Sequence, residues 1–404
     1  MKILHLVHNY YPSIGGSQNL FQHLSEGLVR DYHEEVKVYT TNAMFSPHAA
    51  CNISIPAGIE MHNGVEIHRF PFNTTYPRLY RTIKKLGLPL PFGDLWSQVN
   101  AGPLSLKMYN NICNSDAEII ASTPIYYLNT FYPKLTNRQK NKPFVVFGSL
   151  HAHQNHISRL LLNQIRKADA YVAHTPFEKE YLEQRGIDPA KMHVFGIGVD
   201  VDQLSAGNGK KIREQYHLGN APVVLYFGRH APYKGIDTLI RAMKIVWKTK
   251  PEAYLIIAGS TSPFTKTIQN MIDDLPDSER GHAILIGSVS EQDKVDLYQT
   301  ADIFTTVSSQ ESFGIVYLEA WACGKPVIGG RIGAVQSLIN EGEDGLLVEI
   351  GNSEELGEKI DYLLAHPAEM QRMGKAGFHR VLKDFTWPVI TAKVHNLYQS
   401  LLER

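Results

Sequence analysis

Strand-like and helix-like patterns alternate along the chain, and the alternation begins twice. An apolar run at 3–7 leads through a glycine-containing loop to a helical pattern at 18–30 and a second strand-like run at 36–40. A second series begins with a strand at 223–227 and a helix at 236–248. Strand, helix and strand in succession form the unit of a parallel sheet covered by helices. The chain is therefore predicted to have an α/β fold with two doubly wound, Rossmann-like domains.

The remaining strand-like runs support the same interpretation in both series. They lie at 65–70, 118–121, 144–147, 171–173 and 193–195, and then at 253–258, 283–286, 303–307, 326–328 and 345–348. Between the two series, Gly196-Ile-Gly-Val-Asp200 leads into a polar stretch at 205–211, as is typical of a domain boundary. We predict a first domain at 1–200 and a second at 201–380. Ligands of such sheets bind at the carboxyl ends of the strands, so a cleft between facing domains is the expected site.

The composition excludes several classes of protein. The 404 residues include 40 basic and 40 acidic side chains, whereas nucleic-acid-binding domains usually carry a basic excess. Three cysteines, Cys51, Cys113 and Cys323, are too few for a disulfide framework. The apolar run at 3–7 is too short for a signal peptide or a membrane span. We therefore expect a cytoplasmic globular protein without a nucleic-acid partner.

Two glutamates, Glu311 and Glu319, bracket the most informative motif and have seven residues between them. A strand-like run at 303–307 precedes them, and the helix that carries Glu319 is expected to begin at Ser312 or Phe313. Free N–H groups at the start of a helix carry partial positive charge and suit hydroxyls and phosphates. Carboxylates on both sides can accept hydrogen bonds from sugar hydroxyls. The motif therefore predicts a site for a phosphorylated, hydroxyl-rich ligand.

Two basic residues follow the first strand of the second series. Arg229 and Lys234 lie five positions apart in one loop that leads into a helix. An arginine fork and a lysine ammonium at the mouth of a strand can neutralise a diphosphate. Two solvated surface cations are the alternative interpretation. A Walker loop is excluded, because no glycine-rich run precedes the lysine.

Two glycine-containing loops also follow predicted strands. Gly15-Gly16 lies after the first strand of the chain, where glycines let the backbone approach a phosphate closely, and a plain tight turn is the alternative. Gly287-Ser-Val-Ser290 could offer backbone groups to a flat base. Ser290 could equally cap a helix that has Asp293 at its third position.

Three histidines, His151, His153 and His156, follow the strand predicted at 144–147. Such a cluster suggests a metal site, but the run contains no carboxylate or cysteine. We therefore favour a substrate contact by His151, which is nearest to the strand, and we expect no metal.

Together these features resemble the retaining glycosyltransferases of family 4, which have the GT-B fold of two facing Rossmann-like domains with a cleft between them. Glu311 and Glu319 match the E-x7-E pattern of that family, and Arg229 and Lys234 match its donor-phosphate pair. Gly15-Gly16 matches its first glycine-rich loop.

The resemblance also implies a division of labour between the domains. The first would face the acceptor, the second would bind the nucleotide sugar, and a final helix at 381–404 would cross back onto the first domain. The hinge of the family, usually a variant of P-N-G-V-D, reads Gly196-Ile-Gly-Val-Asp200 here, with Ile197 in place of asparagine.

Each candidate residue receives a role from the resemblance. Arg229 and Lys234 would hold the donor diphosphate and stabilise the leaving group in place of a metal. Glu319 would accept hydrogen bonds from the ribose, and Ser288 and Val289 would lie near the base. Glu311, His151 and the N–H groups of Phe313, Gly314 and Ile315 would bind the donor sugar. Gly15 and Gly16 would approach its phosphates from the first domain.

The implied activity is metal-independent transfer of a hexose from a UDP-sugar, with UDP-glucose as the first candidate donor. It would proceed with retention of configuration and need no cofactor. The acceptor would be a polysaccharide or a lipid-linked saccharide. A basic amphipathic segment at 78–86 could contact the inner face of a membrane, or could be a solvated helix face. The alternative functions are a nucleotide-sugar epimerase of the same fold and a non-catalytic nucleotide-sugar binder.

Overall fold

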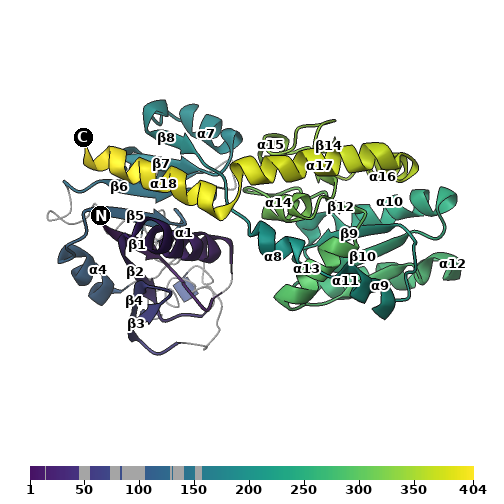
Figure 1. The fold of residues 1–404 in the computed structure, drawn as a ribbon, viewed down its shortest axis with the longest axis horizontal. Coiled ribbons are helices and arrows are strands. Elements are labelled where there is room, and N and C mark those ends of the chain that lie inside the picture. Colours follow the sequence, from purple (N-terminus) through teal and green to yellow (C-terminus); the bar gives the residue numbers. More distant parts are fainter. Residues whose placement is uncertain are drawn as a thin grey trace. The chain divides into compact units, whose positions relative to one another are not determined.

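The computed structural model describes residues 1–13, 15–44, 55–72, 82–83, 105–127, 130, 141–150 and 157–404. The chain forms two compact units, each with its own sheet of mostly or entirely parallel strands (Figure 1). The first unit combines Met1–Ile197 with Trp387–Arg404, and the second consists of Gly198–Thr386. The predicted segments 78–86 and 151–156 lie outside the described residues, apart from 82–83.

The first unit contains an eight-stranded sheet in the order β3-β4-β2-β1-β5-β6-β7-β8. Its strands are β1 (Lys2–Val7), β2 (Glu35–Thr41), β3 (Gly58–His62), β4 (Val65–Phe70), β5 (Ile119–Thr123), β6 (Phe144–Phe147), β7 (Ala170–Ala173) and β8 (Met192–Val194). Its helical elements are α1 (Gly16–Tyr32), α4 (Leu106–Cys113), α6 (Arg159–Lys167), α7 (Pro176–Glu183), η2 (Pro189–Lys191) and α18 (Trp387–Leu402). The inner strands are buried on both faces, which explains why they are visible in the sequence as continuous apolar runs.

The sheet of the first unit is not purely parallel, because β3 pairs antiparallel with β4 at its edge. Asn63 and Gly64 form the turn between them, and both have positive φ angles of 47° and 82°. Such angles match the right-handed twist of a hairpin, and Asn-Gly is their preferred sequence. The strand was not predicted, because most of β3 is exposed and it lacks an apolar run.

The second unit contains a six-stranded, fully parallel sheet in the order β11-β10-β9-β12-β13-β14. Its strands are β9 (Val223–Phe227), β10 (Tyr254–Ala258), β11 (Ala283–Ile286), β12 (Ile303–Thr306), β13 (Val327–Gly330) and β14 (Gly345–Val348). The order extends from β9 in both directions. Right-handed crossovers therefore place the helices on opposite faces of the sheet.

The helices of the second unit form two packed groups. One group contains α10 (Ile236–Thr249), α11 (Phe264–Asp273) and α16 (Ser353–Ala365), and the other contains α8 (Val201–Ser205), α9 (Gly209–Gln215), α13 (Glu291–Thr300) and α14 (Ile315–Ala322). The remaining elements are η3 (Pro232–Lys234), α12 (Asp277–Arg280), α15 (Gly333–Gln336) and α17 (Pro367–Asp384).

The polar stretch at 205–211 is part of the second unit and not a linker. The backbone N–H of Asn208 donates to Asp296 on α13 at 2.7 Å, and the side chain of Gln299 donates to the carbonyl of Leu204 at 2.8 Å. The polar composition therefore reflects capping and contact between helices, and the units divide between Ile197 and Gly198.

The C-terminal helix α18 packs against α1 within the first unit (Figure 1). It begins at Trp387 and not at 381, because α17 continues to Asp384. Gly27 of α1 allows the close approach, since a Cβ at that position would lie 2.8 Å from the hydroxyl of Thr391. His23 also stacks on Trp387 with 4.2 Å between the ring centroids.

A buried histidine on β1 joins both helices. The ring of His5 lies 2.8 Å from the Ser25 hydroxyl through Nδ1 and 3.1 Å from the Tyr398 hydroxyl through Nε2. Because Ser25 donates to the carbonyl of Phe21, we assign the Nδ1–H tautomer, with Nε2 accepting from Tyr398. Burial lowers the pKa of His5 to about 3, so the ring is neutral in the folded unit.

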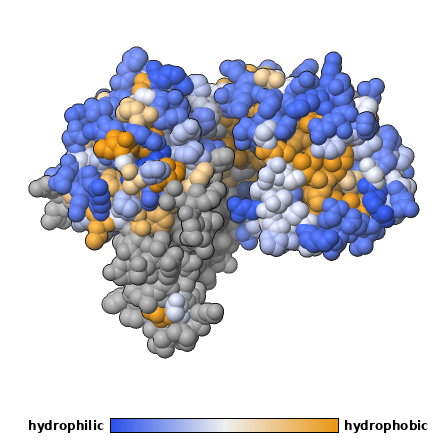
Figure 2. All heavy atoms as spheres, turned by 90° about the horizontal axis from the view of Figure 1, so that it is seen from below, coloured by the Kyte–Doolittle hydropathy of each residue, from blue (hydrophilic) through white to orange (hydrophobic). Residues whose placement is uncertain are grey.

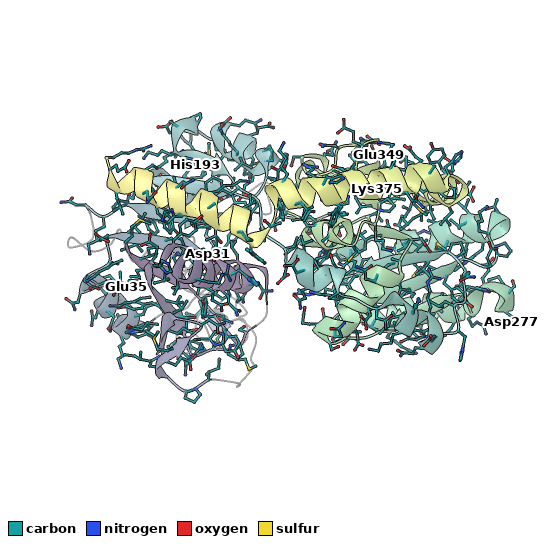
Figure 3. The ribbon with its side chains drawn as sticks, viewed as in Figure 1. Asp31, Glu35, His193, Asp277, Glu349 and Lys375 are labelled. Atoms are coloured by element: carbon teal, nitrogen blue, oxygen red, sulfur yellow. The ribbon has the colours of Figure 1, made fainter. Side chains whose placement is uncertain are left out.

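Charged side chains lie at the surface of both units. Asp31 and Glu35 in the first unit, and Asp277 and Lys375 in the second, are exposed (Figure 3). On the face shown in Figure 2, hydrophilic residues dominate and apolar residues form separate patches. Among the described residues, no helix has both the length and the apolar character needed to cross a bilayer.

We predict that His5 makes the first unit less stable in acid. Unfolding restores the ordinary pKa of 6.5, so between pH 6.5 and 3 the unfolded chain binds a proton that the folded chain excludes, and stability falls as the pH falls. Between pH 7.5 and 5.0 the free energy of unfolding of the first unit should therefore fall by about 1–2 kcal/mol less in His5→Gln than in the wild type. Hydrogen exchange of the β1 and α18 peptides measures this pH dependence of stability when the variant and the wild type are compared at each pH. An identical pH dependence in both proteins would contradict it.

Candidate active site

The loops that follow β9 and β12 lie against each other at the carboxyl edge of the second sheet. The two strands are parallel neighbours, so their following loops leave the sheet side by side. The N–H of Ser309 donates to the carbonyl of Tyr233 at 2.8 Å. Gly235 makes the contact possible, because it has φ 70° and a Cβ there would lie 2.5 Å from the carbonyl oxygen of Val307. A glycine at this position therefore fixes the spacing of the two loops.

The loops after β10 and β11 continue the same edge. The N–H of His230 donates to the carbonyl of Ser260 at 2.9 Å, and the N–H of Gly259 donates to that of Gly287 at 3.3 Å. A Cβ on Gly259 would overlap the backbone of Gly228. The loops after β11, β10, β9 and β12 are thus joined by backbone hydrogen bonds into one continuous edge, which we call the rim. The rim holds the predicted residues of the second domain.

Lys234 and Glu311 face each other across two of these loops. Lys234 ends η3, and its ammonium pairs with the Glu311 carboxylate. Their side chains are only 16% and 13% exposed, respectively, so solvent screens this pair less than a surface ion pair. The sequence identified both residues but did not predict that they bind each other.

Arg229 lies on the same loop with its side chain directed to solvent. The hydroxyl of Tyr226 donates to the carbonyl of Arg229 at 2.8 Å and so holds the backbone at this point. No side chain in the described parts of the chain pairs with the guanidinium. Burial, followed by the nearby Glu311 charge, raises the pKa of Tyr226 far above its ordinary value, so this hydroxyl remains a donor.

Helix α14 begins at Ile315, later than the predicted start at Ser312 or Phe313. Gly314 causes the difference, because its φ of 97° and ψ of 53° are left-handed and interrupt a helical path. Phe313 is buried and packs on the ring of Phe385. The free N–H groups of the first turn therefore lie after Gly314, next to the loop that carries Glu311.

Glu319 lies within α14 and is held by two side chains of α13. The Lys294 ammonium donates to its Oε1 at 3.1 Å, and the Tyr298 hydroxyl donates to its Oε2 at 2.8 Å. Lys294 and Tyr298 are four residues apart and therefore share one face of α13. Neither residue was predicted from the sequence to belong to the site. Their helical spacing was visible, but nothing in it indicated which carboxylate they would meet.

The environment keeps both partners of Glu319 protonated. Burial disfavours the charge on Lys294, but Glu319 and Glu291 outweigh this effect and raise its pKa. Burial, reinforced by Glu319, raises the pKa of Tyr298 well above its ordinary value. Both groups therefore act as hydrogen-bond donors to the carboxylate at neutral pH.

Ser288 and Val289 lie between β11 and α13 on the same rim, with Ser288 exposed. The predicted cap of α13 is confirmed, because the Ser290 hydroxyl accepts from the N–H of Asp293 at 3.1 Å. The preceding loop is thus anchored at its end.

The first unit contains the remaining predicted residues. Gly15 precedes α1, and its carbonyl accepts from the N–H of Asn19 at 2.9 Å. Gly16 is the first helical residue and not part of the loop, so α1 begins two residues before the predicted start. A Cβ on Gly16 would meet nothing within 4 Å, whereas one on Gly15 would meet the Gln18 side chain. His151 lies outside the described residues.

Two Rossmann-like units, the second with this rim, define the GT-B class of fold. Solved structures of the same fold agree with this assignment. The crystal structure of Anabaena Alr3699/HepE in complex with UDP and glucose covers 99% of this chain and 100% of its own, with a TM-score of 0.74 at 20% identity. Sucrose-phosphate synthase from Thermosynechococcus elongatus covers 100% of both chains, with a TM-score of 0.75 at 22% identity.

Sequence comparisons identify the family. Residues 208–380 match the family model described as glycosyl transferases group 1. A GDP-mannose-dependent monoacylated α-(1-6)-phosphatidylinositol monomannoside mannosyltransferase of Corynebacterium glutamicum is 30% identical over 273 residues, which cover 63% of this chain and 70% of the relative. The chain therefore belongs to the group 1 glycosyltransferases, the family-4 type that its motifs predicted.

A second relative matches a shorter segment. A GDP-mannose-dependent α-(1-6)-phosphatidylinositol monomannoside mannosyltransferase of Mycolicibacterium smegmatis is 32% identical over 215 residues, or 51% of this chain. The match spans 56% of that relative, a little over half its length.

We predict that Gly314→Ala destabilises the second unit by about 2–3 kcal/mol. The new Cβ would lie 2.6 Å from the Tyr317 ring, in addition to the strain of φ 97°. Gly324→Ala is the matched control at the other end of α14, because it has φ 67° and nothing within 4 Å of a Cβ. It should cost about 1 kcal/mol. Urea unfolding measures both, and equal losses would contradict the proposed clash.

Proposed function

We propose that the protein transfers a hexose from a nucleoside diphosphate sugar, bound by the rim of the second unit, to a saccharide or lipid-linked saccharide acceptor. The observation that carries this proposal is the arrangement of Arg229, Lys234 and Glu311 on adjoining loops beside the start of α14. Together these groups offer cations, a carboxylate and free amides within one backbone-bonded rim. A sugar joined to a diphosphate presents the complementary groups.

The cations would bind the diphosphate and stabilise the charge that develops on the leaving group. A lysine ammonium has three donors, so Lys234 can keep its bond to Glu311 and still donate to a phosphate. The ion pair would thus orient the lysine before the donor arrives. Arg229, with its exposed guanidinium, would add a fork-shaped contact. Charge placed in this way stabilises the transition state of bond cleavage without a metal.

The other predicted residues would bind the rest of the donor. Glu311 and the amides of Phe313, Gly314 and Ile315 would contact the sugar, and Glu319 the ribose. Ser288 and Val289 would lie beside the base. From the first unit, Gly15, Gly16 and His151 would complete the site, and the acceptor hydroxyl would attack on the face of the departing diphosphate, with retention. We propose a cytoplasmic location, with membrane contact through 78–86 when the acceptor is lipid-linked.

Two donors are the leading candidates. UDP-glucose is the first candidate that the family resemblance suggests, and UDP and glucose are named for a solved structure of the same fold. GDP-mannose is named for the relatives at 30% and 32% identity. We give GDP-mannose more weight, because these relatives are closer in sequence than the structural neighbours are.

We predict that one of these donors supports turnover. Release of GDP from GDP-mannose and of UDP from UDP-glucose should be measured with purified protein and a membrane or polysaccharide extract as acceptor source. Extract-dependent release from one donor is expected. Tight nucleotide binding without release from any nucleoside diphosphate hexose would support the non-catalytic binder instead, and an epimerised donor without release would support the epimerase.

We predict that Lys234→Ala lowers kcat/KM for the donor by about a hundredfold or more, because it removes a transition-state contact and leaves Glu311 without its partner. Lys359→Ala is a matched control on α16, where the ammonium pairs with Glu341 and Glu355, and it should keep wild-type kinetics. Steady-state release assays check both variants. Wild-type kinetics in Lys234→Ala would contradict the site assignment.

We further predict that EDTA leaves turnover unchanged, because protein cations would neutralise the diphosphate. The assay is donor release before and after chelation and dialysis. A loss of activity that Mg²⁺ or Mn²⁺ restores would overturn the metal-free mechanism.

A further inference from the structure

We propose that Tyr298 and Lys294 are positioning residues that set the dependence of nucleotide binding on the ribose hydroxyls, by holding the Glu319 carboxylate in one orientation. The inference rests on the proposed function, in which Glu319 contacts the ribose. It goes beyond that function by assigning the hydroxyl selectivity to two side chains of α13 that do not themselves touch the donor.

The orientation of Tyr298 is fixed by its surroundings. Its side chain is fully buried, and its ring contacts Phe227 at 5.6 Å and Phe304 at 5.5 Å between centroids. Its hydroxyl therefore points in one direction, toward Oε2 of Glu319 at 2.8 Å. A buried phenol is a rigid donor, because the packing around the ring leaves few alternative rotamers.

Lys294 holds the other carboxylate oxygen. Its ammonium lies 3.1 Å from Oε1 of Glu319 and 2.7 Å from Glu291, and the side chains of Lys294 and Glu319 are 18% and 12% exposed. With one donor on each oxygen, the carboxylate cannot rotate without losing a bond. A carboxylate accepts hydrogen bonds and donates none, so both oxygens serve as acceptors.

This arrangement leaves a defined pair of acceptor positions. A carboxylate has about four lone-pair sites, and Tyr298 and Lys294 occupy two. The remaining two lie one on each oxygen and suit two neighbouring hydroxyls that both donate, as the 2′ and 3′ hydroxyls of a ribose can. Hydrogen bonds to an ionised acceptor are stronger than neutral ones. Loss of the Tyr298 hydroxyl would free the carboxylate to rotate and weaken both contacts.

A purely structural role predicts a different outcome. If Tyr298 and Lys294 only join α13 to α14, their loss would lower stability and weaken every nucleotide to the same degree. A positioning role instead predicts a larger loss for the ribonucleotide, which has both hydroxyls, than for the 2′-deoxy and 3′-deoxy forms, which have one each. The hydroxyl selectivity therefore distinguishes the two roles.

The test is calorimetric titration of the full chain with UDP and GDP, each as the ribonucleotide and as its 2′-deoxy and 3′-deoxy form. In the wild type each missing hydroxyl should weaken binding about tenfold. In Tyr298→Phe the ribonucleotide should bind about five- to tenfold more weakly than in the wild type. The deoxy penalty, which is the factor by which loss of one ribose hydroxyl weakens binding, should fall below about threefold. In a Glu319→Gln background, adding Tyr298→Phe should change binding less than about twofold.

Tyr317→Phe is the matched control. Tyr317 is equally buried, and its hydroxyl donates to the carbonyl of Thr306 at 2.8 Å and not to a carboxylate. It should keep the wild-type deoxy penalty even if stability falls. Lys294→Gln is the second variant and carries the same expectation as Tyr298→Phe, should the latter fail to fold.

An unchanged deoxy penalty in Tyr298→Phe or in a folded Lys294→Gln would overturn the inference while leaving the proposed function intact. A reduced penalty in Tyr317→Phe would overturn it too, because the effect would then belong to any buried hydroxyl. If the wild type binds neither UDP nor GDP, the proposed function itself fails.

Discussion

The parallel pairing of β9 with β12 is the constraint on which the candidate site depends. The chain continues from β9 to β10 on one side and has β12 on the other, so the loops after β9 and β12 diverge to opposite faces while they start side by side. This switch in strand order is where doubly wound sheets bind ligands. Lys234 and Glu311 meet there although they are 77 positions apart in the sequence.

Glycines let the rim close without side chains between the loops. Gly235 and Gly259 allow backbone contacts that a Cβ would prevent, and Gly314 redirects the chain into α14. The charged residues are then held by buried tyrosines, with Tyr226 on the Arg229 carbonyl and Tyr298 on Glu319. Preorganised groups of this kind lose little on binding, because they are oriented before the ligand arrives.

Much of the fold could be predicted from local sequence. Strands β4, β9 and β14 have the predicted bounds. Strand β9 is a continuous apolar run, whereas in β4 buried residues alternate with partly exposed ones over most of its length, and both patterns are typical of strands. The exposed edge strand β3 gives no such signal. The starts of α1 and α14 were misplaced, and at α14 the cause is the left-handed backbone of Gly314. The E-x7-E motif indicated its helix, whereas the partners of its glutamates are tertiary contacts from α13 and η3 that no local pattern encodes.

The central claim is that a nucleoside diphosphate binds to the rim of the second unit, and a hydrogen-exchange footprint tests it most directly. Exchange of the wild-type chain should be followed with and without saturating UDP or GDP. We predict slower exchange in the loop that contains Arg229 and Lys234 and in the segment from Glu311 to Glu319, while α12 and α16 stay unchanged. Protection confined to other segments, or none at saturating nucleotide, would contradict the account.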